Sequence, residues 1–144
     1  MDGWHLGYTI DVDEKNTVIY AKIHGLWKAE TAENYHNDFK EEVEPLLGEP
    51  WARLIDCTNW KTSRNEVTDL VGRHMAWSRQ HNAALSLYVL DNPSTFRQLN
   101  QMIIKGGTKD TARIFRKREE AEAFLKKNWL DLPKEKRGQV PLVD

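Results

Sequence analysis

The sequence predicts a single α/β domain with the order ββαβαβαβα, a five-stranded and mostly parallel sheet, an antiparallel edge strand and four main helices. Three observations support this fold class. After two opening strands, short apolar runs alternate with segments of helical periodicity. A single helix between successive strands requires a crossover connection, which makes those strands parallel. A length of 144 residues suits one domain with its own hydrophobic core.

The first two strands should form a hairpin. Residues 8–13 alternate strictly between apolar and polar side chains, which is typical of an edge strand with one solvated face. Residues 14–16 read as a tight polar turn, and residues 17–23 carry apolar side chains on both faces. Gly25 should end this second strand.

Residues 28–47 have the period of an amphipathic helix, which Pro45 should end or bend. His36 falls among the polar positions of this helix, so we expect it to be exposed. The inward-facing positions are Ala32, Tyr35, Phe39, Val43 and Leu46.

Residues 53–57 form a short apolar run that predicts a buried strand, followed by a polar loop around Trp60. Ser63 and Glu66 match a capping box, which predicts that a second helix begins near Asn65 and runs to about His81. His74 lies at the centre of its apolar face. We interpret it as a hydrogen-bonded core or groove histidine rather than a catalyst or ligand.

Residues 84–90 predict a nearly continuous apolar strand, and Asn92 is expected to cap the third helix with Pro93 in its first turn. Glycines 106 and 107 should end that helix. The side chains expected to face the core are Phe96, Leu99, Met102 and Ile103. Residues 111–116 and 118–130 predict the last strand and helix. The domain therefore spans residues 1–130, with a loosely packed tail at 131–144.

Composition limits the classes of function. Cys57 is the only cysteine, so an intrachain disulfide and a cysteine-rich zinc site are excluded. No apolar run approaches the ~20 residues needed to span a bilayer, and the amino end lacks a signal pattern. We expect a cytoplasmic protein without membrane insertion. Residues 1–50 have a net charge of −7 and residues 51–144 of +6. We read the basic part as a solvated surface, so nucleic acid is not the favoured partner.

Enzyme motifs are absent from the sequence. A catalytic triad can be composed from Asp56, His74 and a nearby hydroxyl, but such combinations arise easily by chance. Cys57 and His74 could be paired as thiol and imidazole, yet Cys57 lies in an apolar run where cysteine acts as a small hydrophobe. We expect no catalytic residue, no metal site and no cofactor.

The order of elements, the helix-opening loop after the third strand and the ending at residues 112–125 (ARIFRKREEAEAFL) resemble the STAS family. This family includes the sporulation anti-sigma-factor antagonists, and the resemblance implies a bacterial protein. The resemblance covers most of residues 8–130. It implies a sequential strand order and a function in protein–protein switching, or in anion or nucleotide sensing, rather than catalysis.

The family's switch is a phosphorylatable serine in a D-S-[ST]-G motif at the start of the helix after the third strand, and this chain lacks that motif. Ser63 is the nearest hydroxyl, with Thr62 beside it and Asn65 close to the serine's place. Arg64 is placed to help hold a phosphate there. We favour a structural cap at Ser63 over a phosphosite, and keep Ser63 and Thr62 as possible sites of modification.

We therefore expect a non-enzymatic STAS-like module that binds another protein, either an anti-sigma-factor-like partner or a second copy. A small molecule or anion is also possible. The binding residues are predicted where the parallel strands end and two helices begin. They are Asp56, Trp60, Ser63, Arg64, Asn65, His74 and Asn92. The alternative is a small-molecule or lipid carrier whose pocket walls are Trp27 and Trp60. An enzyme is the third possibility.

Overall fold

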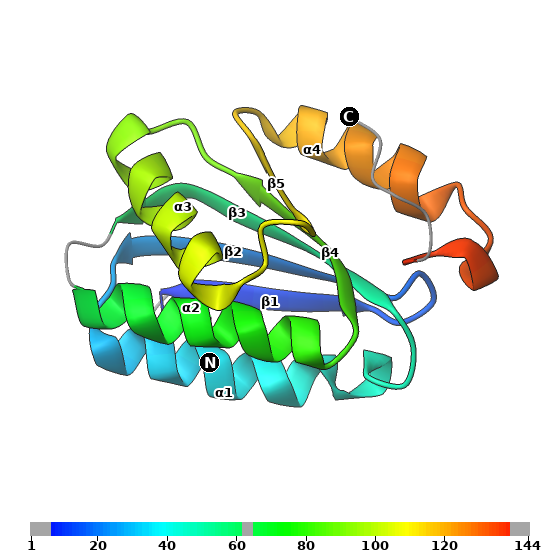
Figure 1. Cartoon of the computed structure of the whole chain (residues 1–144), viewed down its shortest axis with the longest axis horizontal. Coiled ribbons are helices and arrows are strands. Elements are labelled where there is room, and N and C mark those ends of the chain that lie inside the picture. The colour runs from blue at the N-terminus through cyan, green and yellow to red at the C-terminus, as the bar shows by residue number, and fades with distance from the viewer. Residues whose placement is uncertain (1–6, 62–64, 139–144) are drawn as a thin grey trace.

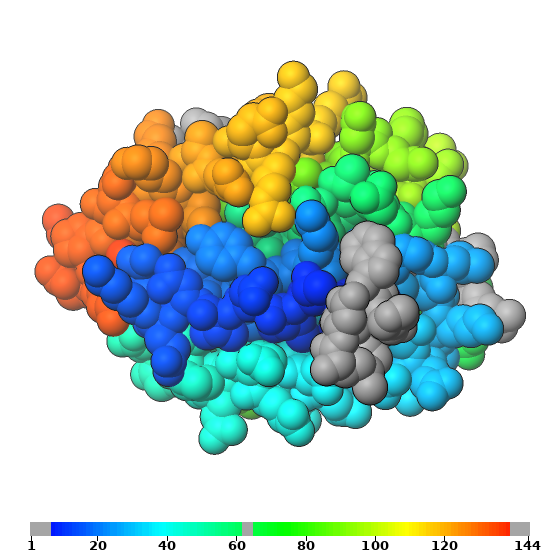
Figure 2. Space-filling model, turned by 180° about the vertical axis from the view of Figure 1, so that it is seen from behind, coloured from blue at the N-terminus to red at the C-terminus, as the bar shows by residue number. Residues whose placement is uncertain are grey.

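The computed structural model describes residues 7–61 and 65–138 and contains one five-stranded sheet with the sequential order β1-β2-β3-β4-β5 (Figure 1). The strands are β1 (Tyr8–Asp13), β2 (Val18–Leu26), β3 (Trp51–Lys61), β4 (Ala83–Val89) and β5 (Ala112–Phe115). β1 pairs antiparallel with β2, and every other neighbouring pair is parallel. This confirms the predicted fold class and the place of β1 at an edge. Figure 2 shows residues of β1 and β2 at the surface between α4 and α1.

Within the described residues, four α-helices cover the sheet on its two faces. They are α1 (Ala29–Val43), α2 (Asn65–Gln80), α3 (Pro93–Gly106) and α4 (Arg118–Leu125). A 3-10 turn (Glu44–Leu46) follows α1, as Pro45 predicts. Within the described part of the chain, no helix is long and apolar enough to cross a membrane.

The two faces of the sheet carry separate hydrophobic cores. Side chains alternate along a strand, so Ile55 and Cys57 of β3 face α1, α2 and α3, whereas Leu54 faces α4. The core below α4 is the smaller one and includes Ala121, Leu125 and Trp129. Alternation breaks at the register shift in β3, so Cys57 and Trp60 both face the larger core although three positions separate them.

β2 and β3 are longer than the sequence predicts. The predicted loop around Trp60 is instead the end of β3, where Asn59, Trp60 and Lys61 pair with His24, Gly25 and Leu26 of β2. A register shift between Lys22 and His24 accommodates the extension. The predicted end of β2 at Gly25 and of β3 at Cys57 is wrong because pairing between the two strands continues beyond their apolar segments.

Phe96 of α3 is another exception, because its side chain is 46% exposed rather than in the core. Leu99, Met102 and Ile103 are buried as predicted. The predicted last helix is α-helical only to Leu125 and continues as a π turn (Lys126–Leu130).

The beginning of the predicted tail is not loosely packed. Arg137 is buried, and its guanidinium donates hydrogen bonds to the carbonyl oxygens of Trp129 (2.8 Å), Leu132 (3.2 Å) and Asn16 (3.1 Å). Trp129 Nε1 also donates to Asn16 O, at 2.9 Å. These contacts attach the tail to the turn between β1 and β2.

Candidate functional site

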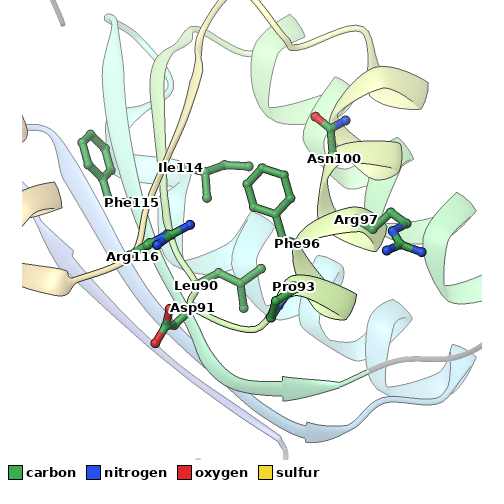
Figure 3. A pocket seen from close by; sticks show the side chains of 9 residues that line it. All are labelled: Leu90, Asp91, Pro93, Phe96, Arg97, Asn100, Ile114, Phe115 and Arg116. Carbon is green, nitrogen blue, oxygen red and sulfur yellow. The ribbon is translucent and has the colours of Figure 1, made fainter.

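The carboxyl ends of β4 and β5 and the start of α3 enclose a groove of about 460 Å³ (Figure 3). Its side chains come from α3, from β5 and from the residues that directly follow β4 and β5. They are Leu90, Asp91, Pro93, Phe96, Arg97, Asn100, Ile114, Phe115 and Arg116. The groove lies at the edge of the sheet where the sequence predicts binding.

Asn92 begins α3 beside this groove, as predicted. Its side-chain oxygen accepts hydrogen bonds from the backbone N–H groups of Ser94 (2.9 Å) and Thr95 (3.2 Å). Its backbone oxygen accepts from Phe96 N–H at 2.8 Å. Asn92 therefore satisfies the N–H groups at this helix start, which are not free to bind a ligand.

Trp60 does not lie on the predicted rim. Its side chain is 1% exposed, and its ring packs edge-on against Trp27 with 5.5 Å between centroids. Trp27 is equally buried, so these two rings are not the walls of an open pocket. Trp51 is buried in the same core as Trp27 and Trp60, and Trp129 in the core below α4. Packing thus explains these four large side chains.

Thr62, Ser63 and Arg64 lie outside the described residues. Asn65, the first residue of α2, is exposed. With Lys61, which is also exposed, it flanks the expected phosphosite in sequence.

Asp56 lies on the α4 face of the sheet. Its carboxylate accepts hydrogen bonds from Thr58 N–H (3.0 Å) and Thr58 Oγ1 (2.6 Å), and forms an ion pair of 3.3 Å with Arg118. Burial raises the pKa of Asp56, but the bonds from Thr58 and Arg118 outweigh burial and hold the pKa below its usual value. Asp56 therefore joins β3 to the start of α4 as a carboxylate.

His74 is buried between α1 and α2, with its Nδ1 atom 2.9 Å from His36 Nδ1. His36 is half-buried and not exposed as predicted, because helix packing brings it onto His74. Burial is the main cause that lowers the pKa of both imidazoles. Arg53 and His36 add to the effect at His74, and Lys40 and Arg53 at His36. Both rings are neutral at pH 7, with one Nδ1 donating and the other accepting.

The buried guanidinium of Arg53 lies on the same side of the sheet as His74. It donates to Ser78 Oγ at 2.7 Å and stands 5.0 Å from the centre of the Phe39 ring. Cys57 is also on this side, and burial raises the pKa of its thiol. A protonated, buried thiol behaves as a small apolar group, which agrees with the interpretation from sequence.

Three of the predicted site residues lie far apart in the structure. Asn92 lies beside the groove, Asp56 faces α4, and His74 lies between α1 and α2 on the opposite face from Asp56. Asp56 and His74 therefore do not form a catalytic triad. Across residues 7–61 and 65–138, no group of three His, Cys, Asp or Glu side chains gathers as a metal site.

The groove residues Phe96, Arg97, Ile114 and Arg116 were missed from sequence. Phe96 shares helical spacing with Leu99 and Ile103, so its periodicity indicates a core position. The available signal was two basic residues, Arg97 directly after Phe96 and Arg116 directly after β5. Such residues are common on surfaces, which is why they carry little weight alone.

Comparison with known proteins gives a likeness of structure. No family model matches the sequence, and no curated protein matches it. Among solved structures, an anti-sigma factor antagonist from Mycobacterium paratuberculosis superposes with a TM-score of 0.53 and 16% sequence identity. The match covers 82% of this chain and 93% of that chain. The chain therefore has the fold of an anti-sigma factor antagonist, the STAS fold that its order of elements predicts.

Proposed function

We propose that this chain is a non-enzymatic regulatory module that binds another protein through the surface around the start of α2. The observation that carries the proposal is the STAS fold shared with an anti-sigma factor antagonist, a protein named for its action on another regulatory protein. Asn65 supports the choice of surface because it is exposed at the first position of α2. We place the module in the cytoplasm.

The residues considered for catalysis support a binding role. Asp56 is engaged by Thr58 and Arg118, and His74 is buried on the other face. The remaining nucleophile, Cys57, is a buried thiol whose raised pKa disfavours the reactive thiolate. Each of these side chains has a structural environment that accounts for it.

Site-specific cross-linking tests the proposal. A photoreactive amino acid replaces Asn65, or Lys127 on the turn after α4 as the matched control, and the chain is expressed in its native cell. We expect one defined protein to cross-link at position 65 and not at position 127. An excess of unlabelled chain should compete, whereas the Asn65→Trp variant should compete at least about tenfold less well because a bulky ring obstructs the contact. Equal cross-linking at both positions would contradict the proposal.

Phosphorylation of Ser63 or Thr62 is the form of regulation that fits this surface. A phosphate near the start of α2 would be stabilised by the helix dipole and would change the charge presented to a partner. Tandem mass spectrometry of the chain from its native cell should locate phosphate on one of these hydroxyls. In the unmodified protein, Ser63→Ala should cost ~1 kcal/mol of stability if Ser63 caps α2, and Ser63→Asp should be nearly neutral.

A further inference from the structure

The groove between α3 and β5 has an apolar surface that the fold leaves uncovered. Phe96 and Ile114 point toward one another across it, with Leu90 and Pro93 at one end (Figure 3). Ile104 lies two helical turns after Phe96 on α3 and is 55% exposed. Contiguous exposed apolar surface, here formed by Phe96, Pro93 and the half-buried Ile114, is typical of a contact surface.

Two unpaired cations stand beside this apolar surface. Arg97 and Arg116 are exposed, and neither forms an ion pair with any residue that the structure describes. Asp91 is the one acidic residue in the lining. The N–H groups at the start of α3 are already satisfied by Asn92, so they do not compete for an anion. The groove is therefore complementary to a carboxylate attached to an apolar group.

The open edge of β5 adds backbone hydrogen-bonding groups to the same place. The carbonyl oxygens of Thr111 and Phe115 accept bonds from β4, at 2.9 and 2.8 Å, so the alternate residues Ala112 and Ile114 direct their backbone outward. The guanidinium of Arg113 donates to Ala112 O at 2.9 Å and covers that position. The N–H and C=O of Ile114 remain at the edge, beside the groove.

We propose that this groove binds an extended segment of another protein, in which apolar residues are flanked by acidic ones. The segment lies along β5 and exchanges backbone hydrogen bonds with Ile114. Its apolar side chain contacts Phe96 and Pro93, and its carboxylates pair with Arg97 and Arg116. The outward backbone groups of Ile114 favour a peptide, because a fatty acid would leave them without partners. This surface is separate from the start of α2.

A peptide array tests the assignment. The purified chain is applied to octapeptides in which one to three apolar residues are flanked by Asp or Glu, and to matched octapeptides with Lys in place of each acid. Binding should be confined to the acidic set and should weaken as salt is added. In solution, the best peptide should perturb the backbone amide signals of Phe96 and Ile114.

Variants of the chain test three features of the groove one at a time: the two arginines, the backbone N–H of Ile114 and the side chain of Phe96. Arg97→Glu combined with Arg116→Glu should weaken the best peptide at least about tenfold, while Lys127→Glu leaves it unchanged. Ile114→Pro removes the outward N–H at an edge position that tolerates proline, and should also weaken binding. Phe96→Ala should act in the same direction, and its circular dichroism should match that of the parent chain because Phe96 is exposed.

Three outcomes would overturn the inference. They are equal binding of acidic and basic peptides, binding of oleate but no peptide in the groove, and a concentration-dependent dimer that perturbs Phe96 and Ile114 without any peptide. None of the groove variants changes the start of α2. Failure of the peptide experiment therefore leaves the cross-linking at Asn65 as an independent measure of the proposed function.

Discussion

At the scale of single residues, the contact between His36 and His74 is one that the sequence does not predict. His36 lies among the polar positions of its helix and His74 on the apolar face of its own. The two are 38 residues apart in sequence, so neither position indicates a contact between them. Only the packing of α1 against α2 joins their Nδ1 atoms. Burial disfavours the charged form of both imidazoles, which couples their protonation to the stability of the fold.

This coupling predicts that acid destabilises the protein before its carboxylates titrate. Unfolded His74 takes up a proton near its ordinary pKa of 6.5, whereas the folded pKa lies well below that value. The unfolded chain therefore binds more protons as pH falls below 6.5, and the free energy of unfolding decreases by up to ~1.4 kcal/mol per pH unit for each such histidine. Urea denaturation between about pH 7.5 and pH 5 measures this slope.

His74→Asn should reduce the slope, because it removes one titrating group. Asn37→Ala, in the same groove between α1 and α2 but without a titratable group, should leave the slope unchanged. The comparison rests on the pH dependence rather than on absolute stability, which the loss of a buried ring lowers in any case. An unchanged slope in His74→Asn would show that His74 does not contribute.

At the scale of elements, the sequence predicts those helices, strands and caps that depend on neighbouring residues alone. Strand and helix periods and the cap at Asn92 identify the order of elements, since each signal is local. The end of β3 was not predictable in this way, because it depends on pairing with β2. The exposure of Phe96 has a similar cause. The sheet ends at β5, and no strand of the described chain lies beyond it to cover the groove.

The crossing of α2 and α3 depends on two glycines that periodicity does not identify as packing residues. A Cβ atom at Gly106 would lie 2.6 Å from the carbonyl oxygen of Gly72, which is closer than atoms can approach. Gly106→Ala should therefore separate the helices and lower the free energy of unfolding by ~1–3 kcal/mol. At Gly48 a Cβ would meet nothing within 4 Å, so Gly48→Ala should change stability by less than ~0.5 kcal/mol. Equal urea midpoints for the two variants would refute this account.

At the scale of the whole molecule, Arg137 connects parts of the chain that are far apart in sequence. Its guanidinium bonds to Asn16 O at a separation of 121 residues, and its cation lies 5.6 Å from the centre of the Trp129 ring. The sequence analysis missed this contact because residues after 130 show no periodicity. A buried arginine that satisfies backbone carbonyls leaves no pattern in the neighbouring residues.

Arg137→Ala should lower the free energy of unfolding by ~2–4 kcal/mol, because several carbonyl groups lose a charged donor at once. The adjacent Lys136 is exposed, so Lys136→Ala provides the matched control and should have little effect. Thermal unfolding followed by circular dichroism compares the two. Similar midpoints would mean that the tail contributes nothing to stability.

The contacts of Asn16 with Trp129 and Arg137 also have a consequence for the time at which the protein becomes stable during its synthesis. Each strand pairs with the strand that precedes it in the chain, so the sheet can grow in the order in which the ribosome releases it. The turn at Asn16 is released before Trp129 and Arg137, so its contacts with them form only after those two residues have emerged. A nascent chain arrested before residue 129 should therefore be cleaved by proteases much faster than one arrested after Arg137 has left the exit tunnel.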